Sequence, residues 1–117
     1  MQITVKRTYE AAEASDGYRV LIDRLWPRGI SKEKLALDEW CREVAPSTEL
    51  RKWFNHEEAK ASEFHRRYEV ELSGSDAAER LLVRAKASGK ATMTLLFSAK
   101  TADLSQAPTL KKYLENL

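Results

Sequence analysis

The chain has 117 residues, a mass of 13.4 kDa and a formal net charge of +2, with 20 basic and 18 acidic residues. This length suits one domain spanning residues 1–117, and a hydrophobic share of 43% is typical of a globular protein rather than a disordered one. The small net charge argues against a dedicated nucleic-acid binder, and no apolar run approaches the roughly 18 residues of a membrane span. The chain starts without a signal-peptide pattern, and its single cysteine, Cys41, cannot form an internal disulfide. We therefore expect a cytoplasmic protein.

The first half of the chain contains two predicted strands. Ile3–Val5 is short and β-branched, and residues 8–17 then read as a connection. The segment 18–25 is the strongest strand, and its centre, 20–22, is apolar on both faces, as in a strand covered on both sides. Trp40 to Val44 fits a short strand or a helix equally well, and the sequence leaves that choice open.

The second half is mainly helical. Ser47 is a favourable N-cap for a helix that carries Leu50, Trp53 and Phe54 on one face. A second helix is predicted over 58–73, with Phe64, Tyr68 and Leu72 on one stripe, and a third from Asp76 to Ser88, capped by Asp76 with Glu79 and ended by Gly89. A strand is predicted over 91–97. The last predicted helix has Pro108 in its first turn and one apolar stripe, formed by Leu110, Tyr113, Leu114 and Leu117. Strands separated by helices predict an α/β fold, a single layered domain with a small, mostly parallel sheet flanked by helices.

Chemistry in such folds lies beyond the carboxyl ends of the strands, where loops converge. Two strand ends carry polar side chains, and they would meet at one crevice if the strands are parallel: Asp23, Arg24 and Arg28 after the first, and Ser98 and Lys100 after the last. Arginine offers forked donors that suit a carboxylate or a phosphate. The alternative is a rigid loop in which Trp26 plugs the core and Asp23 pairs with an arginine. The residues favour neither interpretation over the other.

Other functional signals are sparse. No Gly-rich cradle precedes Lys100, so no nucleotide cofactor is predicted. His56 follows a helix end, where a capping or surface role is the commoner one, although it is the one candidate for a near-neutral acid or base. His65 lies beside Arg66 and Arg67 and is expected to be solvated. The two histidines have no cysteine nearby, so no metal site is predicted.

Several motifs, taken in order, resemble those of the YeaO-like family, domain of unknown function 488. They are Asp23-Arg24-Leu25-Trp26-Pro27-Arg28-Gly29, Ala45-Pro46-Ser47, Leu50-Arg51-Lys52-Trp53-Phe54 and Thr94-Leu95-Leu96-Phe97-Ser98-Ala99-Lys100. The resemblance covers nearly the whole chain and implies a small cytosolic α/β protein, bacterial or archaeal, without an established activity. The chain also departs from the family pattern, because Leu104-Ser105-Gln106-Ala107 stands where relatives tend to carry His-Asn-Asn-Ala.

The leading hypothesis is a site for a small anionic ligand, bound by Arg24 and Arg28, completed by Ser98 and Lys100, with Asp23 orienting an arginine. The alternatives are a regulatory module that acts through nucleic acid or a protein partner, and a structural module in which the loop only braces the fold. The sequence does not decide whether the protein is an enzyme. Basic residues are in excess in 1–37 and 81–117, which contain the two predicted loops, whereas 38–80 is acidic.

Overall fold

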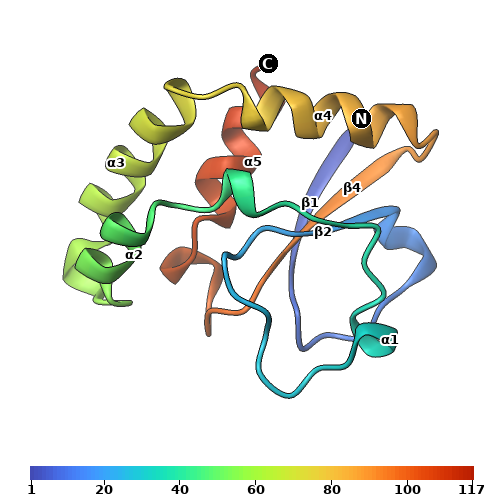
Figure 1. Ribbon diagram of the computed structural model, residues 1–117, viewed down its shortest axis with the longest axis horizontal. Coiled ribbons are helices and arrows are strands. Elements are labelled where there is room, and N and C mark those ends of the chain that lie inside the picture. Colours follow the sequence, from blue (N-terminus) through green and yellow to red (C-terminus); the bar gives the residue numbers. More distant parts are fainter.

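The computed structural model describes residues 1–117 and contains a four-stranded sheet in which all paired strands are parallel. The strands are β1 (Gln2–Arg7), β2 (Tyr18–Leu21), β3 (Glu39–Trp40) and β4 (Thr92–Phe97). The α-helices are α1 (Lys32–Leu35), α2 (Thr48–Phe54), α3 (Ala61–Ser73), α4 (Ala77–Ala87) and α5 (Ala107–Glu115). The strand order is β1-β4-β2-β3, so the segments that leave β2 and β4 start side by side at one edge of the sheet (Figure 1). The predicted α/β class is confirmed.

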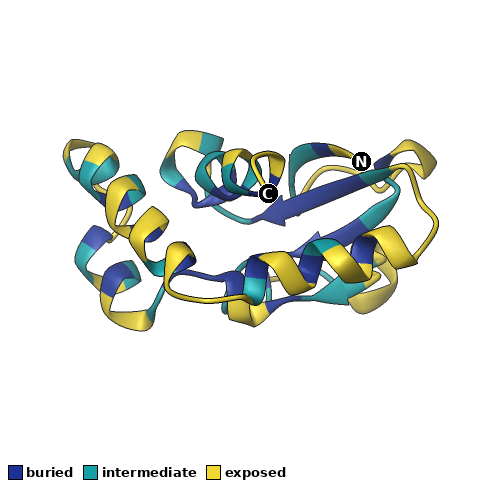
Figure 2. Ribbon diagram, turned by 90° about the horizontal axis from the view of Figure 1, so that it is seen from above, coloured by how far each residue is buried: buried dark blue, intermediate teal, exposed yellow.

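Apolar residues cover the sheet on both faces. The larger cluster joins residues in or directly after the strands to residues of the four longest α-helices: Val20, Ile22, Met93, Leu95, Phe54, Phe64, Leu81 and Leu110. On the opposite face, Leu21 and Leu96 pack with Leu35 of α1. Figure 2 accordingly shows a buried strand bordered by helices whose outward faces are exposed. The predicted double coverage of residues 20–22 is confirmed, since all three side chains are fully buried.

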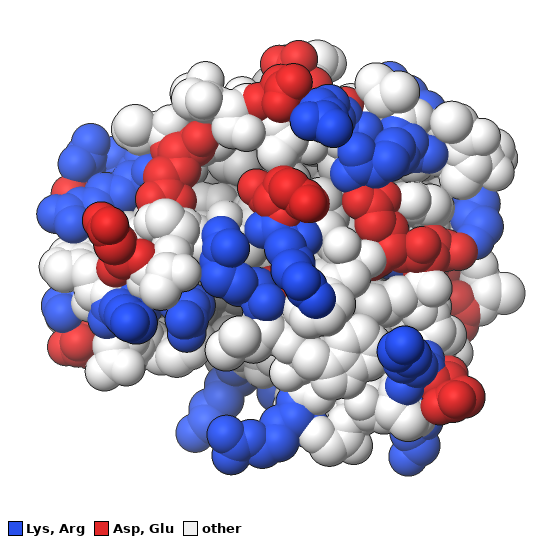
Figure 3. Space-filling model, viewed as in Figure 1, with Lys and Arg blue, Asp and Glu red and all other residues white.

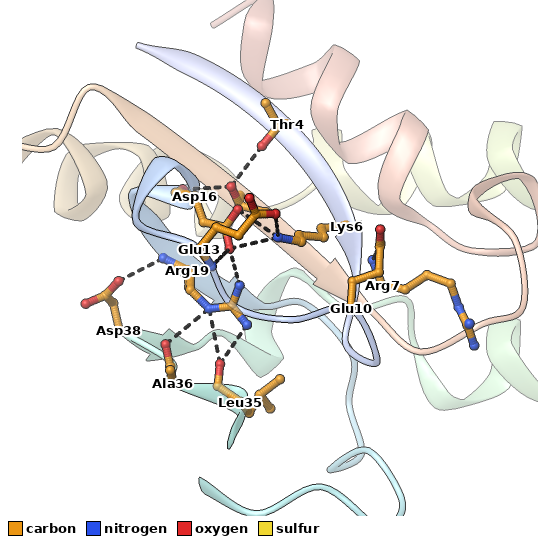
Figure 4. A network of polar contacts seen from close by, with 11 residues as sticks. Thr4, Lys6, Arg7, Glu10, Glu13, Asp16, Arg19, Leu35, Ala36 and Asp38 are labelled. Carbon is orange, nitrogen blue, oxygen red and sulfur yellow. Dashed lines mark hydrogen bonds and ion pairs between the residues drawn. The ribbon is translucent and has the colours of Figure 1, made fainter. Parts of the chain in front are cut away.

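A buried polar network occupies the remainder of the second face (Figure 4). Asp16 accepts hydrogen bonds from the Lys6 ammonium at 3.1 Å and from Arg19 Nη1 at 2.5 Å. The Arg19 guanidinium also donates to the carbonyl oxygens of Leu35 and Ala36 at the end of α1. The network therefore attaches α1 to β2 through the Arg19 guanidinium, whose charge is paired with the buried Asp16.

Several of the helical predictions are confirmed. The Ser47 hydroxyl caps α2 by accepting from the Leu50 amide at 3.1 Å, and the predicted stripe of α3 is buried. Gly89 has a φ of +79° after α4, and Pro108 lies in the first turn of α5. Residues 40–44, for which a strand and a helix were both possible, contain a part of each: β3 ends at Trp40, and a 3₁₀ turn follows over Arg42–Val44.

Several boundaries differ from the predictions. The strand expected over 18–25 ends at Leu21, because the backbone amide of Ser98 pairs with the side chain of Asp23 instead of with a strand carbonyl. The helix expected over 58–73 starts with a separate 3₁₀ turn over Glu58–Lys60. The short helix α1, capped by the Ser31 hydroxyl, was not predicted.

Three side-chain predictions are wrong. Asp76 makes no side-chain cap; instead, the Ser75 hydroxyl accepts from the Ala77 amide. Leu117 is 49% exposed, because α5 ends at Glu115 before the apolar stripe reaches it. His65 is half-buried and bridges α3 to the chain around α5, with its ring nitrogens 2.7 Å from the Thr109 hydroxyl and 3.1 Å from the Asp103 carbonyl oxygen.

None of the helices is long and apolar enough to cross a membrane.

Candidate functional site

A cavity of about 750 Å³ lies at the edge of the sheet where β2 and β4 end. Its walls come from the loop after β2, the segment after β4, the end of α2 and the residues before α5. All six residues proposed from the sequence line this cavity: Asp23, Arg24, Arg28, His56, Ser98 and Lys100. The parallel sheet therefore brings together side chains from distant parts of the chain, as expected from the strand-end rule.

Four basic side chains line the cavity, and none of them forms an ion pair. They are Arg24, Arg28, Arg51 and Lys100. Arg24 donates only long hydrogen bonds, of 3.3 and 3.4 Å, to the Pro46 carbonyl oxygen, and Nε of Arg51 is buried without any partner. In Figure 3, Lys and Arg side chains gather at the centre and the lower edge of the face over which the loop after β2 runs. Arg51 Nε is thus a buried donor without a partner, which costs free energy, whereas Arg28 and Lys100 are exposed to solvent.

Asp23 is the single acidic residue of the cavity wall, and it does not pair with an arginine. Its carboxylate instead accepts from the Ser98 backbone amide at 2.9 Å and from Nε2 of Gln106 at 3.0 Å. Burial raises the pKa of Asp23, although these hydrogen bonds and the charge of His56 oppose the rise. The expectation that Asp23 orients an arginine is therefore wrong. Its carboxylate ties the end of β2 to the end of β4 and leaves the arginines free.

The loop after β2 is fixed by its tryptophan. The Trp26 indole donates to the Ile30 carbonyl oxygen at 2.8 Å and packs edge-on against Trp40, with ring centroids 5.4 Å apart. Trp40 in turn donates from its indole to the backbone oxygen of Asp23 at 2.7 Å. The rigid-loop interpretation and the cavity interpretation are thus compatible, because the braced loop forms a preformed wall.

His56 lies at the rim of the cavity, after the end of α2. Asn55 and His56 both have left-handed backbone conformations, with φ of 48° and 56°, and the Asn55 amide caps the helix by donating to the Arg51 carbonyl oxygen. The imidazole is exposed and makes no hydrogen bond to the protein. No protein group therefore fixes the orientation of the His56 ring.

Among the wall residues that sequence reasoning did not propose are three with polar side chains: Tyr9, Arg51 and Gln106. Arg51 lies three positions before Phe54, which also lines the cavity, so helical spacing could have identified it. Gln106 lies in the segment where the chain departs from the family pattern, and this departure could have identified it as a residue of the cavity wall. Tyr9 follows β1 and donates its hydroxyl to the Arg28 carbonyl oxygen at 3.1 Å, a contact without a local signature.

The cavity wall combines cationic, acidic and aromatic side chains. No group of three or more His, Cys, Asp or Glu side chains is placed to hold a metal ion. Cys41 is fully buried and lies outside the cavity, and burial raises the pKa of its thiol to about 12. What remains is a set of cations, one tethered carboxylate and the aromatic side chains of Phe54 and Phe64.

Comparison with known proteins gives a family without an assigned activity. Residues 2–117 match the family described as "Inactive DUF488-N3 subclade". The chain is 47% identical to the uncharacterized protein YeaO of Escherichia coli (strain K12) over 117 residues, which cover all of both chains. It is 38% identical over 113 residues to an uncharacterized protein of Mycobacterium tuberculosis (strain H37Rv), covering 97% of this chain and 93% of the relative. No solved structure matches the chain significantly.

Proposed function

Because the chain belongs to the YeaO-like DUF488 family, in a subclade described as inactive, we propose that it is a non-catalytic binding protein for a small anionic ligand. The observation that supports this function is the set of four basic side chains without carboxylate partners on one 750 Å³ cavity. The ligand binds with its anionic group among these cations.

The absence of an oriented acid or base agrees with binding rather than turnover. Asp23 is engaged by Ser98 and Gln106, and His56 has no group that orients its ring. The positions where relatives tend to carry His-Asn-Asn-Ala hold Leu104, Ser105 and Gln106 on the cavity wall. The departure from the family pattern thus falls at the site itself, where it would remove side chains capable of proton transfer.

The nucleic-acid alternative has weaker support. Its candidate surface is the part of α3 that carries Arg66 and Arg67, but both arginines pair with Glu63 at 2.7–2.8 Å. A phosphate track needs basic side chains that are free to release counterions on binding. Binding of a labelled oligonucleotide that weakens steeply between 50 and 200 mM salt would favour this alternative over a small-molecule site.

The direct test is the affinity for phosphate, sulfate and phosphate monoesters, measured by calorimetry and by ligand-induced thermal shift. Arg28→Ala should weaken binding about tenfold or more, because hydrogen bonds to a charged group are worth about 1.5–3 kcal/mol. Arg80→Ala is the matched control, since it removes the same charge from an exposed pair on α4, outside the cavity. The proposal fails if no anion binds, or if both substitutions weaken binding equally.

A further inference from the structure

The amide of Gln106 is held in one orientation at the wall of the cavity. Its Nε2 donates to the Ile22 carbonyl oxygen at 2.8 Å and to Oδ1 of Asp23 at 3.0 Å. Both partners accept hydrogen bonds, so a flipped amide would place an oxygen against two oxygens. The side chain therefore presents its nitrogen to the end of β2, and its own oxygen, Oε1, is left for another partner.

Oε1 of Gln106 has no hydrogen-bond partner in the protein, although only 7% of the residue is exposed. Arg51 Nε is the single fully buried side-chain polar atom without a partner. The unpartnered Oε1 therefore keeps some solvent-accessible surface, on a residue that lines the cavity. The site thus combines a fixed, unpartnered acceptor with cationic side chains that form no ion pair. A ligand that satisfies both must carry two kinds of group.

The group that meets Gln106 must donate a hydrogen bond. A phosphate or carboxylate oxygen would be repelled by Oε1 and by the neighbouring Asp23 carboxylate. An ammonium group would donate, but Arg24, Arg28, Arg51 and Lys100 line the same cavity and would oppose a further positive charge. A neutral donor such as a hydroxyl meets neither objection.

The anionic end of the ligand is best matched by a phosphate monoester. Such a group carries a charge of about −1.5 to −2 near pH 7 and has three strong acceptor oxygens, which suits several forked donors. A cavity of about 750 Å³ also leaves room for a body attached to the phosphate. We infer that the ligand is a phosphorylated polyol, with its phosphate among the four basic side chains and a hydroxyl donating to Gln106. This inference rests on the proposed function of the cavity.

The test compares ligands that differ only in their hydroxyl groups. Three pairs of phosphate monoesters have matched chains: glycerol 3-phosphate with n-propyl phosphate, ribitol 5-phosphate with n-pentyl phosphate, and sorbitol 6-phosphate with n-hexyl phosphate. Their affinities are measured by calorimetry for the native protein, for Gln106→Met and for the control Gln2→Met, which changes an exposed glutamine on β1. For at least one pair, Gln106→Met should shift the affinity ratio about three- to tenfold toward the alkyl phosphate, while Gln2→Met leaves the ratio unchanged.

The outcomes separate the two proposals. If no phosphate monoester binds the native protein, the proposed function is wrong and this inference falls with it. If the monoesters bind but the ratio is the same in the native protein and in Gln106→Met for all three pairs, only the inference is overturned.

A second measurement needs no protein variant, because Gln106→Met also removes the two hydrogen bonds that Gln106 donates. Hydroxyls of the polyol phosphate with the highest affinity are replaced one at a time by hydrogen. One replacement should weaken binding to the native protein about three- to tenfold, since the acceptor then loses its donor. Equal affinities across the whole deoxy series would overturn the inference.

Discussion

Replacing Asp16 with alanine should destabilise the protein by about 3 kcal/mol, because the substitution leaves a buried guanidinium without its counterion. Asp16 is 7% exposed and Arg19 is 4% exposed, so neither charge is well solvated. Asp16 also accepts from the Lys6 ammonium and from the Glu13 backbone amide. Alanine would remove all of these contacts at once.

The magnitude follows from what each partner retains. Removing one member of a buried ion pair costs about 3–5 kcal/mol. The lower end applies here, because Arg19 keeps its hydrogen bonds to the Leu35 and Ala36 carbonyl oxygens, and Lys6 keeps Glu13 at 2.9 Å. For a domain of this size, 3 kcal/mol lowers the Tm by roughly 10 °C.

Urea denaturation at pH 7 and scanning calorimetry measure this loss. The control is Asp76→Ala, which breaks an exposed 3.8 Å pair with Arg80 and should cost no more than about 0.5 kcal/mol. A cost for Asp16→Ala as small as that of Asp76→Ala would refute the reasoning, because it would mean that the buried pair contributes no net stability.

The same network makes a prediction about pH. Burial tends to raise the pKa of Asp16, but hydrogen bonds from Glu13, Lys6 and Arg19 outweigh it and hold the pKa below 3.8. Stability from an ionised group with a lowered pKa is complete above the unfolded value and disappears as the pH falls through the folded value. The stability difference between the native protein and Asp16→Ala should therefore be constant above about pH 5 and shrink in more acidic solution. A difference that grows with acid would contradict the assignment.

Three further predictions concern the backbone and two titrating groups. Gly17→Ala should lower the free energy of unfolding by several kcal/mol, since φ is +66° and a Cβ would lie 2.2 Å from the Thr92 carbonyl oxygen. Gly29→Ala is the control: φ is +79° but the surrounding space is open, so the loss should be about 1 kcal/mol. Equal urea midpoints for the two variants would contradict the steric argument. Cys41, buried and with a thiol pKa of about 12, should resist iodoacetamide in the native state and react only after unfolding; rapid native labelling would be inconsistent with its burial. Burial and the neighbouring Glu39 raise the pKa of Tyr18 to about 12. Its neutral phenol therefore stabilises the fold below pH 10, and this contribution is lost between about pH 10 and 12. An ultraviolet difference spectrum that shows no tyrosine titrating above about pH 11 would refute this prediction.

The parts of the fold that the sequence predicts are those determined by local pattern. The strand through Val20–Ile22 is identifiable because it is apolar on both faces, and α3 because Phe64, Tyr68 and Leu72 repeat at helical spacing. The end of β2 is not local: it depends on a bond between Asp23 and the Ser98 amide, 75 positions away. No pattern within residues 18–25 reports that contact.

The candidate site divides in the same way. The strand-end rule brings Arg24, Arg28 and Lys100 to one cavity, because it depends only on strand direction. It cannot supply Arg51, which comes from a helix, nor the hydrogen bond between Gln106 and Asp23, which depends on the chain before α5 lying against the end of β2. A carboxylate beside two arginines in sequence suggests an ion pair, whereas the folded chain gives that carboxylate neutral donors.

The distribution of charge along the chain has to be interpreted through these pairings. The basic ends of the sequence do supply Arg24, Arg28 and Lys100, but the fourth cation, Arg51, comes from the acidic middle segment 38–80. In that segment Glu63 neutralises the basic face of α3, whereas no carboxylate reaches Arg51. The field in the cavity is therefore set by which charges remain unpaired, not by how many each segment contains. Since its one carboxylate is held by Ser98 and Gln106, the four cations of the wall have no carboxylate partner.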